Sequence, residues 1–247
     1  MIQRLTIKKV ITVNHFTYTD FLSKFGVGSA HPGGFELTKE IVRTKNIDNH
    51  SHILDVGCGT GQTAAYLANE YNAIVTGIDR HPTMVEKAKK RMEKQHLLVD
   101  ILHCSIENVP LQNNTFDLVL AESVLSFVNK PTALKEIFRL LKKGGQLIAI
   151  EFTINKPLDA AIIHEIKQFY GFESILTEQD WIRYFKQAGF TTVQLESKHP
   201  LHPNDSTPEF DYSQHVEREL YDIMEQHHEM ILKYKDIWDY RVFTCKK

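Results

Sequence analysis

The stretch His52–Ala68, HILDVGCGTGQTAAYLA, decides the fold of this chain. It opens with a short apolar run that predicts a buried strand, and an alanine-rich run at its end predicts a helix. Between them three glycines stand at alternate positions, Gly57, Gly59 and Gly61. Glycine lacks a Cβ, so it adopts positive φ easily and lets a ligand approach the backbone. The stretch therefore predicts the first β–α turn of a nucleotide-binding α/β fold.

The spacing of the glycines separates two classes of ligand. A dinucleotide fingerprint has the form G-x-G-x-x-G, whereas this loop has the form G-x-G-x-G. Asp55, Gly57, Gly59 and Gly61 match, position for position, motif I of the class I S-adenosylmethionine-dependent methyltransferases, which the stretch resembles. The resemblance implies that these four residues bind S-adenosyl-L-methionine. The alternative is a tight strand–helix turn that binds no ligand.

A second acidic position supports the ligand-binding interpretation. Ala73–Ile78 predicts the second strand, and Asp79 follows it about 20 residues after the glycines. A carboxylate at this place can accept hydrogen bonds from ribose hydroxyls, and it would repel a 2′-phosphate. Asp79 also matches the ribose-binding acid of the family, and its neighbour Arg80 is expected to flank the adenine.

The ends of the next two predicted strands add further candidates. After the third strand the family often carries an acidic residue that contacts the adenine amino group, and here Ser105 stands in that place. Its hydroxyl can still accept a hydrogen bond, and Ile106 can pack on the base. Glu122 follows the fourth strand, Thr115–Leu120, and is a candidate to orient the substrate or the ammonium group of the cofactor. The alternative is a carboxylate at the start of a helix, favoured by the helix dipole.

The remaining strands and helices alternate along the chain, which predicts a mainly parallel sheet. The segment LKKGGQLIAIE resembles the helix–GG–strand signature of the family, so a helix over Lys130–Lys143 is expected to stop at Gly144-Gly145. Glu151, at the end of the strand that follows, is expected either to face the substrate or to be solvated. The predicted fold class is α/β: a Rossmann-like, mainly parallel seven-stranded sheet with helices on both faces and an antiparallel last strand. The other expected elements are strands Leu97–His103, Gln146–Glu151, Thr191–Glu196 and Trp238–Cys245, and helices Pro82–Gln95, Pro157–Tyr170 and Thr177–Gly189.

Two parts of the chain lie outside the motifs. Residues 1–50 are expected to form an N-terminal arm or lid, in which Ile2–Val13 is a strand or an extended segment. Residues 51–247 are expected to form the methyltransferase domain, with a helical insert near 199–235 that carries a long amphipathic helix after Ser213. In the family such N-terminal segments fold over the cofactor and help to wall the substrate pocket.

The candidate catalytic residues are His31, Tyr18 and Glu122, because a base near the acceptor would help to remove its proton. The segment His31–Gly34 is expected to belong to a lid, and its glycines to approach the methionine end of the cofactor. The alternative is that the aromatic residues of this region are core residues and the glycines are turns.

Composition argues against several other classes of function. Of the 247 residues 42% are hydrophobic and 24% charged, as in ordinary globular proteins, and the formal net charge of −2 supplies no field to attract nucleic acid. No run reaches the length of a membrane span. The cysteines are odd in number and lack C-x-x-C spacing, so they are expected to be reduced thiols of a cytoplasmic protein. No metal site is predicted, and four histidines are expected at the surface: His199, His202, His227 and His228.

The sequence thus predicts an S-adenosylmethionine-dependent methyltransferase that moves a methyl group to a small-molecule acceptor by in-line displacement. The arrangement of its last elements resembles family members that act on small molecules, including ubiquinone/menaquinone methyltransferases. No membrane or nucleic-acid partner is expected, and the acceptor and the oligomeric state stay open. The alternatives are a nicotinamide oxidoreductase, a non-catalytic S-adenosylmethionine-binding protein and an RNA methyltransferase.

Overall fold

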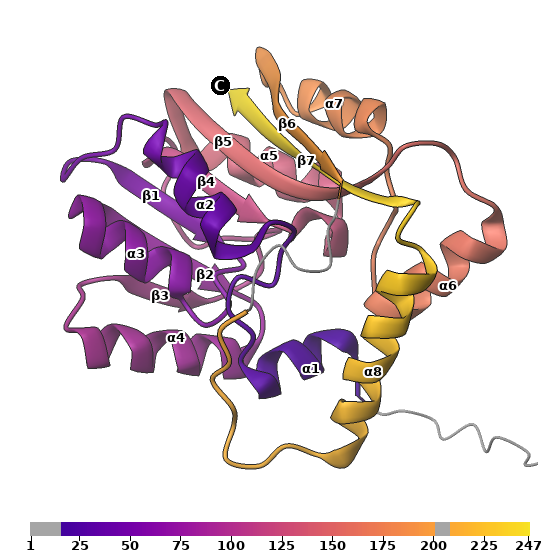
Figure 1. The fold of residues 1–247 in the computed structure, drawn as a ribbon. Helices are drawn as coiled ribbons and strands as arrows, with labels where there is room; N and C mark the ends of the chain where they lie inside the picture. The colour runs from indigo at the N-terminus through magenta and orange to yellow at the C-terminus, as the bar shows by residue number, and fades with distance from the viewer. Residues whose placement is uncertain (1–15, 201–207) are drawn as a thin grey trace, which may run out of the picture.

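The computed structural model describes residues 16–200 and 208–247, with the backbone alone over 197–200. Within these ranges the chain forms a seven-stranded sheet in the order β3-β2-β1-β4-β5-β7-β6 (Figure 1). Neighbouring strands from β3 to β5 are parallel, and β7 runs antiparallel to both β5 and β6. The predicted fold class is therefore confirmed. The strands are β1 (His52–Val56), β2 (Ile74–Asp79), β3 (Asp100–His103), β4 (Phe116–Glu122), β5 (Leu141–Ile154), β6 (Thr192–Pro200) and β7 (Trp238–Lys246).

Helices cover both faces of the sheet because its strands alternate their apolar side chains between two cores. In β1, for example, Ile53 packs with helices α2, α3 and α4, whereas Leu54 packs with α5 and α7. A strand buried on both faces carries apolar residues in succession, as these strands do. The helices are α1 (Tyr18–Phe25), α2 (Gly34–Arg43), α3 (Gln62–Tyr71), α4 (Pro82–Gln95), α5 (Lys130–Leu140), α6 (Ala160–Tyr170), α7 (Glu178–Gln187) and α8 (Arg218–Lys233), with a 3₁₀ turn, η1 (Leu125–Phe127).

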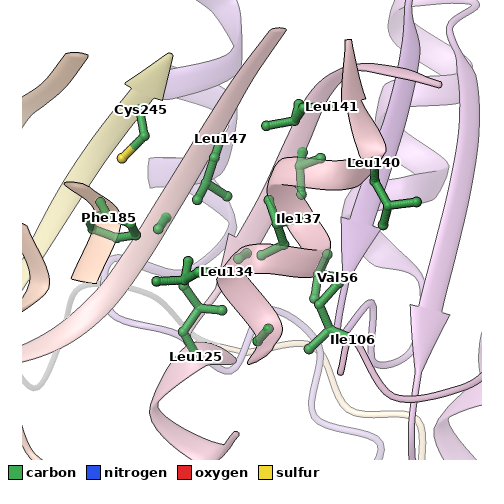
Figure 2. Close-up of a cluster of buried hydrophobic side chains, with 14 of the residues drawn as sticks. Val56, Ile106, Leu125, Leu134, Ile137, Leu140, Leu141, Leu147, Phe185 and Cys245 are labelled. Atoms are coloured by element: carbon green, nitrogen blue, oxygen red, sulfur yellow. The ribbon is translucent and has the colours of Figure 1, made fainter. Parts of the chain in front are cut away.

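Helix α5 shows how one face is closed. Asn129 caps its start by accepting a hydrogen bond from the Thr132 amide at 3.1 Å. Leu134, Ile137 and Leu140 then follow at helical spacing and point into the core between β4, β5 and α7 (Figure 2). All three are fully buried. The periodic leucine and isoleucine positions therefore fix which side of α5 faces the sheet.

The end of α5 differs from the prediction. The helix stops at Leu140, not at Lys143, and β5 begins at Leu141, which is buried and pairs with Phe116 of β4. The pair Gly144-Gly145 therefore lies inside a strand. Gly144 has φ +81°, and a Cβ on Gly145 would stand 3.1 Å from the Phe116 carbonyl oxygen. These glycines make an irregularity in the β4–β5 pairing instead of a helix cap, because burial of Leu141 favours the extended backbone.

Several strand boundaries also differ from the prediction: β4 ends at Glu122 and not at Leu120, and β5 ends at Ile154 and not at Glu151. Strand β3 begins at Asp100 and not at Leu97, because the Leu97 amide donates to the Met92 carbonyl at 3.0 Å and so closes the end of α4. Strand β6 continues to Pro200, where the backbone still pairs with β7. The expected strand or arm over Ile2–Val13 lies outside the described residues.

A third core joins the N-terminal helix to the C-terminal part of the chain. Helices α1, α6 and α8 lie together on one side of the sheet (Figure 1) and share a cluster of aromatic and aliphatic side chains. Its buried members are Tyr18, Phe21, Phe25, Val27, Ile166, Tyr170, Phe172, Leu220, Ile223, Met230, Tyr234 and Trp238. The expected amphipathic helix after Ser213 is thus present as α8. None of the helices described is long and apolar enough to cross a membrane.

Candidate functional site

A cavity of about 170 Å³, here called the cofactor cavity, opens where β1, β2 and β4 end. Ligands bind at this edge of open α/β sheets. The predicted catalytic residues Tyr18 and His31 reach it from the N-terminal segment. Among the predicted cofactor-binding residues only Gly61 is absent from its walls. Those that line it are Asp55, Gly57, Gly59, Asp79, Arg80, Ser105, Ile106 and Glu122.

The three glycines of the loop are required for three different reasons, although all have positive φ. A Cβ on Gly57 would stand 2.4 Å from a methyl carbon of Val124. A Cβ on Gly61 would stand 2.7 Å from the Met92 methyl, so Gly61 allows α3 to pack closely against α4. A Cβ on Gly59 would meet no atom within 4 Å. Gly59 therefore bares its backbone to open space in the cavity, where a ligand can approach.

Asp79 ends β2 and holds the glycine loop in place. Its Oδ2 accepts a hydrogen bond from the Gly59 amide at 3.0 Å, and its Oδ1 accepts one from the His81 amide at 2.7 Å. Burial raises the pKa of Asp79, although these two backbone hydrogen bonds oppose the shift. Each oxygen keeps a further lone pair, so the carboxylate can still accept from ribose hydroxyls.

Asp55 is a second buried carboxylate beside the same loop. It is 2% exposed, and its Oδ2 has no hydrogen-bond partner in the part of the chain that the structure describes. Burial raises the pKa of Asp55 well above its usual range, and the charges of Glu122 and Asp79 add to the shift. Three carboxylates thus face one cavity with an unpartnered oxygen among them. These acceptor groups fit a positively charged ligand that carries hydrogen-bond donors, such as S-adenosylmethionine.

The predicted adenine contacts are placed less favourably. The Ser105 hydroxyl donates to the Glu107 carboxylate at 3.2 Å and accepts from the Glu107 amide at 3.2 Å, so it is occupied within its own loop. Ile106 is 3% exposed and lies between the cavity and the core under α5. The side chain of Arg80 forms part of the cavity wall. Of these three, Ile106 is the apolar side chain on which a base could pack.

Glu122, at the end of β4, joins the sheet to the N-terminal segment. Its Oε1 accepts from the Thr38 hydroxyl at 2.6 Å, and its Oε2 accepts from the Thr63 hydroxyl at 2.9 Å. Thr38 also lies 3.1 Å from His31 Nε2, which is 3.7 Å from Glu122 Oε1. The ring of His31 is fixed on its other side by the Pro32 carbonyl, 3.0 Å from Nδ1. Thr38 and Thr63 were missed at the sequence level because neither stands in a motif position of its own.

A second cavity, of about 380 Å³, adjoins the first and is here called the second cavity. Tyr18 lines both, and no hydrogen bond to its hydroxyl is found among the residues described. The prediction that His227 lies at the surface is wrong: this histidine lines the second cavity, and its Nδ1 is 3.1 Å from the Tyr170 hydroxyl. Burial lowers the pKa of His227 to about 4, and the charge of His228 adds to the effect. The imidazole is therefore neutral near pH 7.

Glu151 of β5 is a buried anchor for the loop beside Gly57. It is neither solvated nor directed at the cavity, as the sequence suggested, but 0% exposed. Its carboxylate accepts from the amides of Val124, Leu125 and Ser126 at 3.1, 2.8 and 3.2 Å, and from the Ser126 hydroxyl at 2.9 Å. Burial raises the pKa of Glu151 to about 7 against these hydrogen bonds. The carboxylate thus fixes the turn η1, from which Val124 closes over Gly57.

Replacing Glu151 with alanine is expected to lower the free energy of unfolding by about 3 kcal/mol, because buried donors lose their acceptor. Urea unfolding at pH 8, where the carboxylate is ionised, measures this loss. Glu151→Gln keeps one carbonyl oxygen as acceptor and is expected to lose about 1 kcal/mol. Equal stability of the alanine and glutamine variants would contradict the role given to these hydrogen bonds.

Several known proteins similar to this chain are named as methyltransferases. A family described as "Methyltransferase domain" matches residues 54–149. The uncharacterized methyltransferase YodH of Bacillus subtilis is 37% identical over 234 residues, which are 93% of this chain and 99% of that protein. Phosphoethanolamine N-methyltransferase 1 of Arabidopsis thaliana is 29% identical over 177 residues, or 70% of this chain. This match covers 35% of the plant enzyme, so the chain spans about a third of that relative.

The fold has solved counterparts as well. Phosphoethanolamine N-methyltransferase 2 of Haemonchus contortus, in complex with S-adenosyl-L-methionine, superposes with a TM-score of 0.77 at 18% identity, over 93% of this chain and 57% of that chain. Residues 16–200 and 208–247 contain no group of three or more His, Cys, Asp or Glu side chains that could hold a metal ion. The nicotinamide alternative is set aside by these matches. The chain belongs to the class I S-adenosylmethionine-dependent methyltransferases, and S-adenosyl-L-methionine is its cofactor.

Proposed function

We propose that this protein methylates a small-molecule acceptor, which binds in the second cavity, by in-line displacement. The observation that carries the proposal is the wall shared by the two cavities. A cofactor site that shares a wall with a mainly apolar cavity can hold a small acceptor beside the cofactor and keep part of the water away from it. The shared wall consists of Tyr18, Leu22, Val27, Ser29, Ala30, His31 and Phe152.

The cofactor, when bound, supplies a methyl carbon made electrophilic by the positively charged sulfonium. The task of the protein is then to bind both reactants, align them and accept a proton from the acceptor where one is lost. We propose that Asp55, Gly57, Gly59 and Asp79 bind the cofactor. Asp55 supplies charge, the glycines supply bare backbone, and Asp79 accepts from the ribose.

Glu122, held in place by Thr38 and His31, is the proposed acceptor of the proton. The Thr38 hydroxyl donates to Glu122 Oε1 and lies beside His31 Nε2, and the Pro32 carbonyl lies beside His31 Nδ1, so both ring nitrogens are occupied. The Glu122 carboxylate lines the cofactor cavity and keeps a lone pair on each oxygen. Tyr18 is better suited to orient the acceptor, because burial raises the pKa of its hydroxyl and keeps it protonated. We therefore propose Glu122 as the base, His31 as the residue that positions it through Thr38, and Tyr18 as a hydrogen-bond donor to the acceptor.

The N-terminal segment and the helix α8 are the proposed cover of the acceptor site. Both contribute to the third core, and both line the second cavity, through Tyr18 and Phe21 on one side and Met224 and His227 on the other. This supports the division into an N-terminal lid, residues 1–50, and a methyltransferase domain with an insert near 199–235.

Methyl transfer from radiolabelled S-adenosylmethionine tests the proposal. The protein is incubated with a total metabolite extract and, separately, with total RNA, and labelled products are separated by size. Label is expected in the low-molecular-weight fraction only. Label in RNA would overturn the proposal, and so would cofactor binding by calorimetry without label in any fraction, which would indicate a non-catalytic binding protein.

A further inference from the structure

The second cavity has a lining that restricts the chemistry of its occupant. Rings form much of its wall, including Phe21, Phe152, Tyr170 and Trp238. Trp238 packs edge-on against Tyr170 with ring centroids 5.8 Å apart, and it lies 5.2 Å from Phe152. Both Tyr170 and Trp238 are at least nine-tenths buried. An apolar body, best a flat one, gains most from such walls.

Among the described residues that line the second cavity, the formal charges have one sign. No aspartate or glutamate stands among the residues that line it, and Lys235 is the single lysine or arginine there within the described ranges. Lys235 lies in the turn after α8 and is exposed, with no hydrogen bond or ion pair to another described residue. The neighbouring His228 is exposed as well. The carboxylates that would attract a cation lie in the cofactor cavity instead.

Polar groups deeper in the cavity are neutral donors. The Tyr18 hydroxyl lies on the wall toward the cofactor, where it stays protonated, and His227 is uncharged near pH 7. A phosphate group would therefore lose its water here without a matching charge. A hydroxyl or carbonyl oxygen would lose little free energy on leaving water, because the Tyr18 hydroxyl can donate a hydrogen bond to it.

From this arrangement we infer the class of acceptor: a predominantly apolar, ring-bearing molecule with a neutral oxygen toward Tyr18 and one anionic group held at the mouth by Lys235. The inference rests on the proposed function, since it takes the second cavity to be the acceptor site. The inferred class of acceptor does not include phosphoethanolamine, which is small, polar and zwitterionic.

Nuclear magnetic resonance of the indole groups tests the inference directly. The chain has two tryptophans, so the full-length ¹⁵N-labelled protein gives two indole N–H signals. Trp238 lines the second cavity, whereas Trp181 is fully buried and donates to the Phe152 carbonyl at 3.0 Å. The variant Trp181→Phe assigns the Trp238 signal. The probes are 6-hydroxy-2-naphthoate, 2-naphthol as its uncharged counterpart, and phosphoethanolamine, each with and without S-adenosylhomocysteine.

A saturable change in the chemical shift of the Trp238 indole signal is expected with both naphthalene probes, and no change is expected with phosphoethanolamine. Lys235→Met is expected to weaken the binding of 6-hydroxy-2-naphthoate about threefold to fivefold, the range of a solvent-exposed ion pair, and to leave the binding of 2-naphthol unchanged. Lys233→Met is the matched control, because Lys233 stands on α8 but pairs with Glu165 outside the cavity. It is expected to change neither affinity.

Three results would overturn the inference: movement of the Trp238 signal by phosphoethanolamine alone, no response to either naphthalene, or equal effects of Lys235→Met and Lys233→Met. Failure of the proposed function gives a different result. The naphthalene probes would then still bind, while no low-molecular-weight product is methylated.

Discussion

Gly59→Ala is expected to weaken the binding of S-adenosylmethionine and of its demethylated product at least 100-fold. Gly59 has φ +54°, and the position of an added Cβ lies in open space of the cofactor cavity, with no protein atom within 4 Å. The added methyl therefore meets no part of the protein and instead occupies room that the ligand needs. A ligand that contacts the bare backbone of a glycine loses this contact when a Cβ is added. Isothermal titration calorimetry with S-adenosylhomocysteine measures the change.

Gly144→Ala is the matched control for backbone strain. Gly144 has φ +81° and likewise no protein atom within 4 Å of an added Cβ, but it lies at the start of β5, outside the cofactor cavity. An alanine in left-handed backbone costs about 1–2 kcal/mol, so both variants are expected to unfold a few degrees earlier. Only Gly59→Ala should lose the ligand. Equal affinities in the two variants would show that the glycine is needed for the turn and not for the ligand.

Local patterns were sufficient to predict most of the fold. The strand–glycine–helix run at His52–Ala68 and the acid at Asp79 depend on contacts within one β–α unit, and such contacts leave a signature in neighbouring positions. The alternation of strands with helices then determines a parallel sheet. The Gly144-Gly145 pair was misplaced because a helix stop and a strand irregularity both favour glycine. The choice between them depended on burial of Leu141 against a strand distant in sequence.

The candidate site was less predictable because its contacts join distant parts of the chain. Thr38, which lies on a helix without a motif, contacts both His31 and Glu122, and Glu122 is 84 positions away from it in the sequence. Glu151 looks like a strand-end carboxylate in the sequence, and only the folded turn η1 shows that three backbone amides require it. His227 looked like a surface residue because an amphipathic helix leaves open which histidines face inward. One signal was available: His227 lies four residues after Ile223, on the buried side of α8.

Asp55→Asn is expected to remove most of the preference for the positively charged methyl donor over its neutral demethylated product. Two unit charges about 6 Å apart interact by about 3 kcal/mol at an effective dielectric constant of about 20, so one carboxylate can change this preference about tenfold or more. Both ligands carry the same adenosyl and amino-acid groups, and only the sulfonium charge differs. The ratio of their dissociation constants therefore isolates the effect of charge.

The preference is also expected to depend on pH in the wild-type protein. Burial raises the pKa of Asp55 in the free protein, and a bound sulfonium lowers it again because the cation favours the carboxylate. The complex then holds fewer protons than the free protein. Affinity for the charged donor should accordingly rise from about pH 4, the ordinary pKa of an aspartate, up to the raised pKa of Asp55. The ratio of the two dissociation constants, titrated from pH 5 to pH 8, should change about tenfold in the wild type and less than twofold in Asp55→Asn.

Asp117→Asn is the control, because it removes the same formal charge at a strand position outside the cofactor cavity. Burial acts to raise the pKa of Asp117, but hydrogen bonds from Lys142 and from the His52 amide outweigh it and lower the pKa. The two variants should therefore change stability in opposite directions. Because burial raises the pKa of Asp55, this carboxyl group costs the folded protein stability above about pH 4, so at pH 8 Asp55→Asn should raise the thermal midpoint without ligand, whereas Asp117→Asn should lower it. If removal of a carboxylate stabilises the ligand-free protein and weakens the binding of the charged ligand alone, then that carboxylate serves ligand binding. If Asp55→Asn lowered the midpoint and left the ratio of dissociation constants unchanged, Asp55 would be a structural residue of the turn.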